Sequence, residues 1–159
     1  MDYVWSPWRY QYIKNIQHSD RCVFCIDPSG TKDREDFVVF RGHSNFVILN
    51  IFPYTTGHLL IAPYLHTASF QDFPPEQLAE MMQLAKRCQS ALEQNYHPDG
   101  FNLGMNLGQC AGAGVAHHLH LHIVPRWSGD ANFMTVVGET RVLPEDLETT
   151  YRKLKSFFI

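Results

Sequence analysis

One stretch of the chain alternates strictly between imidazole and aliphatic side chains: His118-Leu119-His120-Leu121-His122-Ile123-Val124. Because successive side chains of a β-strand point to opposite faces, the pattern predicts a strand with three histidines on one face and Leu119, Leu121 and Ile123 in the core. A plain surface strand rarely carries three histidines in register, so a functional site is predicted on this face. Imidazole can bind a metal, act as a nucleophile or act as a general acid, and all three remain open at this point.

A loop of small residues precedes this strand, with the sequence Gly108-Gln109-Cys110-Ala111-Gly112-Ala113-Gly114. Such loops expose backbone N–H groups that can cradle phosphate oxygens. Alone, the loop favours a simple turn. Directly before three histidines it indicates phosphoryl or nucleotidyl chemistry, with a histidine nucleophile that faces the phosphates.

The rest of the chain predicts an α+β domain with a mainly antiparallel sheet of about five strands. Strands are expected at Phe37–Arg41, Asn45–Asn50, His58–Ala62, Phe101–Asn106 and Val115–Pro125. A long helix over residues 75–96 would bury Leu78, Met81, Met82, Ala85, Cys88 and Leu92. A C-terminal helix over residues 144–158 would bury Leu147, Tyr151, Leu154 and Phe158.

Length and charge limit the classes of protein to consider. With 159 residues the chain predicts a single domain over 1–159, with a core over about 22–127 and an aromatic N-terminal arm over 1–20. The net charge of −3 gives no bulk attraction for nucleic acid or an anionic membrane, and neither is expected as a partner. No apolar run approaches the roughly 20 residues that span a bilayer, and the N-terminus does not resemble a signal peptide. The cytoplasm is therefore the expected compartment.

The pair of cysteines in Cys22-Val23-Phe24-Cys25 has the spacing of a metal knuckle. A redox pair would prefer a helix N-terminus in a βαβ unit, which the pattern lacks. Two unrelated buried thiols are the simpler alternative. A structural zinc site needs two further ligands, which this spacing alone does not identify.

Taken together, these motifs resemble the histidine-triad (HIT) family of nucleotide hydrolases and transferases. The alternating stretch matches the family signature, and the segments Asn50–Pro63 and Gly100–Asn106 resemble its nucleotide-binding segments. The resemblance implies that His120 attacks the α-phosphorus and holds the nucleotide covalently, while His122 hydrogen-bonds the reacting phosphate and His118 completes the triad. The implied nucleotide-binding residues are Asn50 at the ribose, Asn102 and Asn106 on the polar strand face, the backbone of Gly112, Ala113 and Gly114 at the phosphates, and His58 in support.

The resemblance also implies a metal and a partner. The zinc-binding branch of the family combines a Cys-x-x-Cys pair, a histidine after a Pro-x-x-His step and the first triad histidine. In this chain those positions hold Cys22, Cys25, His66 and His118, so the resemblance implies a structural zinc ion that fixes the strand carrying His120. The family pairs two five-stranded sheets, which implies a homodimer.

Two outer segments, Trp5–Ile13 and Pro125–Met134, resemble the bacterial diadenosine tetraphosphate phosphorylase group. That resemblance implies cleavage of dinucleoside polyphosphates with inorganic phosphate as acceptor. The chain departs from it at Gly114, where the group usually has serine, and His117 is expected to be peripheral. Arg126 and Trp127 could contact substrate or only build an interface. The alternatives are a hydrolase of nucleoside phosphoramidates or other adenylylated compounds, and a non-catalytic nucleotide sensor.

Overall fold

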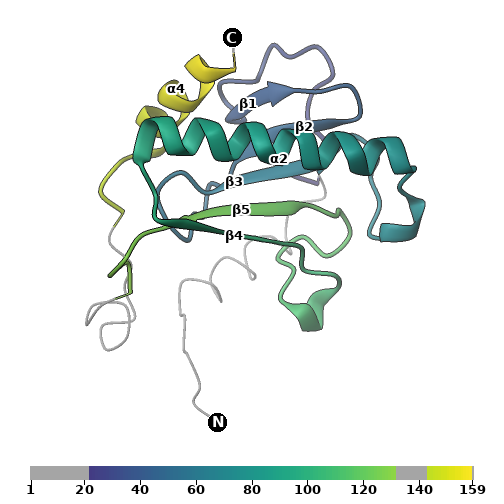
Figure 1. Cartoon of the computed structure of the whole chain (residues 1–159). Coiled ribbons are helices and arrows are strands. Elements are labelled where there is room, and N and C mark those ends of the chain that lie inside the picture. Colours follow the sequence, from purple (N-terminus) through teal and green to yellow (C-terminus); the bar gives the residue numbers. More distant parts are fainter. Residues whose placement is uncertain (1–21, 132–142, 159) are drawn as a thin grey trace.

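The computed structural model describes residues 22–131 and 143–158, and the predicted aromatic arm over 1–20 lies outside the described residues. Five antiparallel strands form one sheet in the order β1-β2-β3-β5-β4 (Figure 1). The strands are β1 Val38–Arg41, β2 Asn45–Leu49, β3 Leu59–Pro63, β4 Gly100–Gly104 and β5 Leu121–Arg126. The predicted α+β class, with one long and one C-terminal helix, is confirmed.

Two α-helices cover one face of the sheet, namely α2 Pro75–Tyr96 and α4 Leu147–Phe157. Helix α2 begins with proline at its first position, where the missing N–H costs nothing, and ends at His97 in the left-handed conformation. Helix α4 begins at Asp146, whose carboxylate accepts the N–H of Thr149 at 2.8 Å. Short 3₁₀ turns, η1 Phe70–Asp72 and η2 Gln109–Ala111, complete the described elements. None of the described helices combines the length and apolarity needed to cross a membrane.

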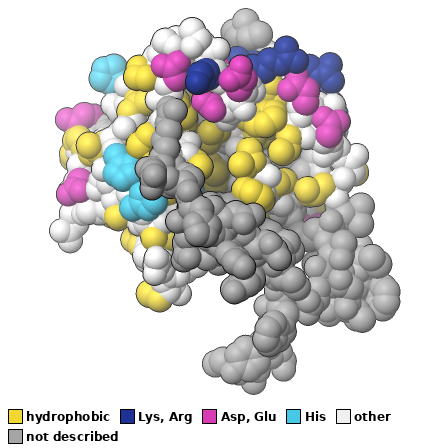
Figure 2. Space-filling model, turned by 180° about the vertical axis from the view of Figure 1, so that it is seen from behind, with side chains coloured by type: hydrophobic (Ala, Val, Ile, Leu, Met, Phe, Trp, Pro, Cys, Tyr) yellow, Lys and Arg dark blue, Asp and Glu magenta, His cyan; other side chains and the backbone are white. Residues whose placement is uncertain are grey.

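The sheet has an apolar cluster on each face. Beneath the helices, Leu59 and Ile61 of β3 and Leu121 and Ile123 of β5 join the side chains of α2 and α4 in the main core. The opposite face carries a smaller cluster formed by Phe24, Val38, Phe46, Ile48, Leu60, Ala62 and Val115. Figure 2 looks onto the molecule from the side opposite α2, where hydrophobic and histidine side chains reach the surface. The alternation of β3 and β5 therefore separates a packing face from a face that can carry chemistry.

The predicted strand Val115–Pro125 is wrong over its first half. Strand β5 begins only at Leu121, and residues 115–120 form turns and an extended approach to the sheet. The N–H of Leu119 donates to the carbonyl of Thr67 in the loop after β3, at 2.8 Å, and does not join the ladder. Only His122 of the three histidines stands on a strand, because the chain enters the sheet after it has passed His118 and His120. The predicted burial of Leu119, Leu121 and Ile123 is nevertheless confirmed.

Helix α2 confirms most of its predicted apolar stripe, and Cys88 is fully buried as expected. Met82 is the exception, because its side chain is 53 % exposed while Met81 beside it is 1 % exposed. The spacing of Met82 fits the margin of the predicted stripe, but this margin faces away from the core. Leu84 and Ala91 take part in the core instead.

The two adjacent methionines give a matched test of this packing. We expect Met81→Ala to lower the free energy of unfolding by about 2–5 kcal/mol, because it leaves a cavity in the core. Met82→Ala should change it by no more than about 0.5 kcal/mol, as is usual for exposed positions. Urea denaturation of both variants would measure the difference, and equal losses would contradict the observed orientation of α2.

Candidate functional site

The candidate site lies on the face of the sheet opposite α2. His122 stands on β5 between Leu60 of β3 and Gly104 of β4, its partners in the strand register. Asn50 follows β2 and His58 precedes β3, and the N–H of Asn50 donates to the carbonyl of His58 at 3.0 Å. The β2–β3 connection with Asn50 and His58 thus meets His122 of the distant strand β5, as the resemblance implies for these three residues.

The turn before β3 places His58 inside the protein. Gly57 has φ of +80°, and a Cβ at this position would stand 2.7 Å from Cδ2 of Leu92 on α2. Both the backbone conformation and the close approach of the helix therefore require glycine. The following residue, His58, is fully buried, so its imidazole must find hydrogen-bond partners within the protein.

The hydrogen bonds of His58 determine which nitrogen of His122 carries a proton. The backbone N–H of Tyr54 donates to Nδ1 of His58 at 3.1 Å, and Nδ2 of Asn50 lies 3.3 Å from the same atom. Nδ1 is therefore an acceptor and Nε2 of a neutral His58 carries the proton. Nε2 of His58 lies 2.9 Å from Nδ1 of His122, so it donates there. His122 then holds its own proton on Nε2, the form that can donate to a phosphate oxygen.

The imidazole of His120 is held in the complementary form. Its Nδ1 lies 2.9 Å from the carbonyl oxygen of His118 and therefore donates to it, which leaves the lone pair on Nε2. The side chain is only 6 % exposed, and its burial lowers the pKa of His120 below the usual value. A neutral imidazole with a fixed lone pair is a competent nucleophile, and the ring of His122 lies beside it with a centroid distance of 4.9 Å.

The loop predicted to hold phosphate oxygens is more ordered than its composition suggests. It contains the 3₁₀ turn η2 between Gly108 and Gly112, both with positive φ. The N–H of Gly112 donates to the carbonyl of Gln109 at 2.9 Å, and that of Ala113 to the carbonyl of Gly108 at 3.3 Å. These bonds fix the loop, and the phosphate contacts assigned to Gly112, Ala113 and Gly114 stay predictions.

On the polar face of β4, Asn102 hydrogen-bonds Arg126, a residue whose role the sequence left undecided. Oδ1 of Asn102 accepts from Nη1 of Arg126 at 2.8 Å, while Asp130 holds Nε and Nη2 of the same guanidinium at 2.5 and 2.7 Å. Arg126 is thus a surface cation on the face that carries His122. The indole N–H of Trp127 donates to the carbonyl of Tyr96 at 3.2 Å, which gives this residue a structural contact. Asn106 is half-buried beyond the end of β4, and its nucleotide role stays a prediction.

A second cluster lies beside His120. The ligand atoms of Cys22, Cys25, His66 and His118 all lie within 4.8 Å of one another. Sγ of Cys22 is 3.4 Å from Nδ1 of His118, and Sγ of Cys25 is 3.2 Å from Nδ1 of His66. Around a tetrahedral zinc ion, a thiolate sulfur and an imidazole nitrogen stand about 3.6 Å apart, given the usual bond lengths. The four side chains therefore fit a closed zinc site, as the resemblance implied.

His118 belongs to this cluster, and its ring nitrogens are directed away from His120 and His122. Its imidazole is fully buried, with Nε2 donating to the carbonyl of Pro63 at 2.9 Å and Nδ1 directed to the Cys22 sulfur. Burial is the main cause that lowers its pKa to about 4, so the ring is neutral, as a metal ligand must be. A second ring nitrogen held by a carbonyl is a usual support for a metal ligand. His117 is exposed and lies against His66, with ring centroids 5.2 Å apart.

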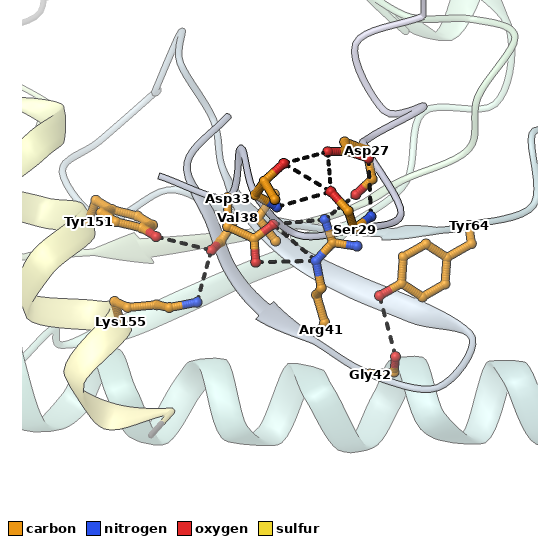
Figure 3. Close-up of polar contacts among 10 residues, drawn as sticks. Asp27, Ser29, Asp33, Val38, Arg41, Gly42, Tyr64, Tyr151 and Lys155 are labelled. Carbon is orange, nitrogen blue, oxygen red and sulfur yellow. Dashed lines mark hydrogen bonds and ion pairs between the residues drawn. The ribbon is translucent and has the colours of Figure 1, made fainter. Parts of the chain in front are cut away.

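A polar network anchors the segment that follows the two cysteines (Figure 3). The guanidinium of Arg41 at the end of β1 binds both carboxylate oxygens of Asp33, and its Nη2 donates to the carbonyl of Asp27 at 2.5 Å. Asp27 in turn accepts from Ser29 and Thr31, and these bonds lower the pKa of the Asp27 carboxyl to about 2. The segment from residue 27 onward is therefore fixed to the sheet without help from the cysteines.

Comparison with known proteins assigns the chain to a family. A model described as HIT domain matches residues 31–129. The chain belongs to the HIT domain family. A relative named AP-4-A phosphorylase from Mycobacterium tuberculosis (strain CDC 1551 / Oshkosh) is 37 % identical over 159 residues, which cover 95 % of this chain and 81 % of the relative. The zinc-bound histidine triad family protein from Mycobacterium smegmatis has 32 % identity and a TM-score of 0.66, covering 86 % of this chain and 92 % of that one. Diadenosine triphosphate hydrolase from Plasmodium falciparum, at 19 % identity and a TM-score of 0.62, covers 83 % of this chain and 76 % of its own and shares the fold.

The metal cluster of this HIT protein makes a direct prediction. The purified chain should carry one zinc ion per protomer, and Cys22→Ser should reduce the bound zinc well below that ratio. Cys110→Ser is the matched control, because Cys110 is an exposed cysteine outside the cluster. With zinc at about 100 times its dissociation constant, its removal should lower the free energy of unfolding by about 2.7 kcal/mol. Atomic absorption and thermal denaturation would measure both effects, and full zinc content in Cys22→Ser would contradict the assignment.

The proton arrangement of the two histidines is also testable. His58→Phe preserves a buried ring of similar size but removes the donor to Nδ1 of His122. We expect the fraction of His122 with its proton on Nδ1 to rise measurably from near zero, since no donor then holds the proton on Nε2. Proton–nitrogen NMR spectra of the imidazole rings measure this fraction. His43→Phe, at an exposed loop histidine, is the control, and an unchanged His122 signal in His58→Phe would refute the arrangement.

Proposed function

We propose that this HIT protein cleaves dinucleoside polyphosphates through a covalent nucleotidyl-His120, with inorganic phosphate as the acceptor. The observation that carries the proposal is the opposite arrangement of two neighbouring rings. His120 directs its lone pair from Nε2 because Nδ1 donates to the His118 carbonyl, and His122 holds a proton on Nε2 because His58 donates to its Nδ1. One ring can attack while the other can donate. The relative named AP-4-A phosphorylase supports this choice of substrate and acceptor.

The first step follows from this geometry. Nε2 of His120 attacks the α-phosphorus, a P–N bond forms, and the P–O bond to the leaving nucleotide breaks. The His120 ring keeps its proton on Nδ1 and becomes positively charged, and the His118 carbonyl stabilises that charge. His122 donates a hydrogen bond from Nε2 to the reacting phosphate. A neutral nucleophile suits this step, because an anionic one would be repelled by the phosphate charges.

The second step returns the enzyme to its starting state. An oxygen of inorganic phosphate attacks the same phosphorus, a P–O bond forms, the P–N bond breaks, and neutral His120 is released. For diadenosine tetraphosphate the two steps together yield ADP and ATP. Asn50 is proposed to bind the ribose, and Asn102, Asn106 and the backbone of residues 112–114 the phosphates. Gly114 offers no side chain to the leaving group, and His122, whose ring lies 4.9 Å from that of His120, is proposed as the donor to the reacting phosphate.

We also propose that zinc is the resident ion of the Cys22, Cys25, His66 and His118 cluster. Four protein ligands leave no open position, so the ion would supply structural cross-linking and not chemistry at the phosphate. The ion would join the turn at Cys22–Cys25 to the loops after β3 and before β5. The zinc-bound relative from Mycobacterium smegmatis supports this assignment.

The proposed reaction is tested with diadenosine tetraphosphate in the presence and absence of inorganic phosphate. ADP and ATP that appear only with phosphate would support phosphorolysis, whereas AMP and ATP without phosphate would indicate a hydrolase. His120→Asn should reduce turnover by at least about 1,000-fold, because it removes the nucleophile. His117→Asn, at the exposed neighbouring histidine, should leave turnover within about twofold. Turnover that survives in His120→Asn would overturn the covalent mechanism, and nucleotide binding without turnover would favour a sensor.

We further propose that the protein is a homodimer joined through β4. This strand is one of the two edges of the described sheet, and Leu103 on it and Leu107 just after it are 46 % and 50 % exposed. An open edge with exposed apolar side chains is a usual pairing surface for a second chain. A second copy would extend the sheet to ten strands and cover both leucines.

The oligomeric state provides the corresponding test. Sedimentation equilibrium should give twice the mass of the chain, and Leu103→Glu should weaken the association at least about tenfold by placing a charge in the interface. Met82→Glu is the control, because Met82 is equally exposed but lies on the outer side of α2. A monomer in the unaltered protein would refute the dimer.

A further inference from the structure

Phe24 lies between the two cysteines of the metal cluster and contacts two of the three triad histidines. Its ring centroid is 5.4 Å from that of His118 and 4.7 Å from that of His120, and its side chain is 5 % exposed. It also packs in the apolar cluster on this face of the sheet. The Phe24 ring takes no part in the proposed attack by His120 or in the hydrogen bond from His122 to the phosphate.

Three contacts define the position of the His120 imidazole. The carbonyl of His118 fixes Nδ1, the ring of His122 lies at 4.9 Å, and the ring of Phe24 lies at 4.7 Å with a tilt of 37°. The first two contacts come from His118 and His122, which lie within two residues of His120 in the sequence. Phe24 is the contact that reaches the nucleophile from the Cys22–Cys25 turn.

The Cys22–Cys25 turn contacts the rest of the protein through its sulfurs and through the apolar packing of Phe24. Within it, the N–H of Cys25 donates to the carbonyl of Cys22 at 3.1 Å, which closes the turn but does not tie it to the sheet. The first residue after the turn that hydrogen-bonds Arg41 is Asp27. Between these points, the described contacts to the body of the protein are the cysteine sulfurs and the apolar packing of Phe24 and its neighbours.

The backbone that carries His118 is anchored differently. Nε2 of His118 donates to the Pro63 carbonyl, and the next N–H, that of Leu119, donates to the Thr67 carbonyl. Neither bond involves a cluster sulfur. Loss of the metal would therefore release the Cys22–Cys25 turn and Phe24 more readily than the carbonyl that fixes Nδ1 of His120.

We propose that Phe24 is a positioning residue for His120, and that through its ring the metal occupancy of the cluster acts on the nucleophile. A metal ion in the cluster fixes the Cys22–Cys25 turn. The turn then holds the Phe24 ring in contact with the His120 imidazole, which stays in the orientation needed for attack. An empty cluster leaves the fold and the substrate contacts in place but lets the His120 ring reorient. The inference rests on the proposed function only for the role of His120.

The test uses the full chain with zinc and after zinc removal, and compares Phe24→Leu with the unaltered protein. Proton–nitrogen NMR spectra report the His120 ring, identified by its loss in His120→Asn, and need no turnover. In the unaltered protein, zinc removal should shift and broaden the His120 signal. Phe24→Leu should show that change already with zinc bound, and zinc removal should add little to it.

Kinetics provide the second readout. Phe24→Leu should lower kcat for diadenosine tetraphosphate about tenfold, with KM changed less than about twofold, because an ill-placed nucleophile slows the chemical step and not binding. Phe24→Tyr should leave both readouts closer to those of the unaltered protein than Phe24→Leu does, since it keeps an aromatic ring beside His120. Phe46→Leu is the control, because Phe46 is buried in the same cluster and packs against Tyr64 with ring centroids 5.3 Å apart.

Each result decides one point. An unchanged His120 signal on zinc removal would overturn the coupling. An equal zinc effect in Phe24→Leu and in the unaltered protein would assign the coupling to the His118 backbone and overturn the role of Phe24. If Phe46→Leu has as large an effect as Phe24→Leu, the effect reflects general packing, and the positioning role of Phe24 is overturned. Spectral coupling without any turnover would refute the proposed function and leave the positioning role standing.

Discussion

The burial of one imidazole, that of His118, organises this protein. Its ring holds the Pro63 carbonyl at the end of β3, its other nitrogen meets the Cys22 sulfur, and its own carbonyl fixes Nδ1 of His120. A fully buried histidine is tolerated because each polar atom of the ring has a partner and the ring stays neutral. The Cys22, Cys25, His66 and His118 cluster, the end of the sheet and His120 thus share one residue.

A chain of three further groups makes the site chemically asymmetric. The Tyr54 backbone N–H and the Asn50 amide set the proton of His58, and His58 sets that of His122. His120 receives the opposite arrangement from the His118 carbonyl. Two identical side chains two residues apart therefore present a lone pair and a proton, which is what attack on one side of a phosphorus and donation to its oxygens require.

The sequence was informative where the physics is local. Alternation placed Leu119, Leu121 and Ile123 in the core, the apolar spacing predicted the long helix over residues 75–96, and the motifs identified the HIT family. Alternation could not show where the sheet ends, so the strand was extended to Val115 although the ladder starts at Leu121. Met82 was misplaced because helical spacing alone does not show how wide a face of the helix is buried. The contact of Phe24 with His120 was invisible, since nothing in Cys-Val-Phe-Cys indicates which ring the phenylalanine will touch.

The close approach of Gly57 to Leu92 has a consequence for the dynamics of the site. The turn that carries His58 rests directly on the long helix from the other side of the sheet, with no room even for a methyl group. A local fluctuation that opens this turn must therefore also loosen the main core beneath α2. Amide hydrogens of the turn should consequently exchange with solvent only through openings that approach global unfolding, although the turn borders the site and lies outside regular secondary structure. The stiffness of the candidate site then depends on the core on the other side of the sheet.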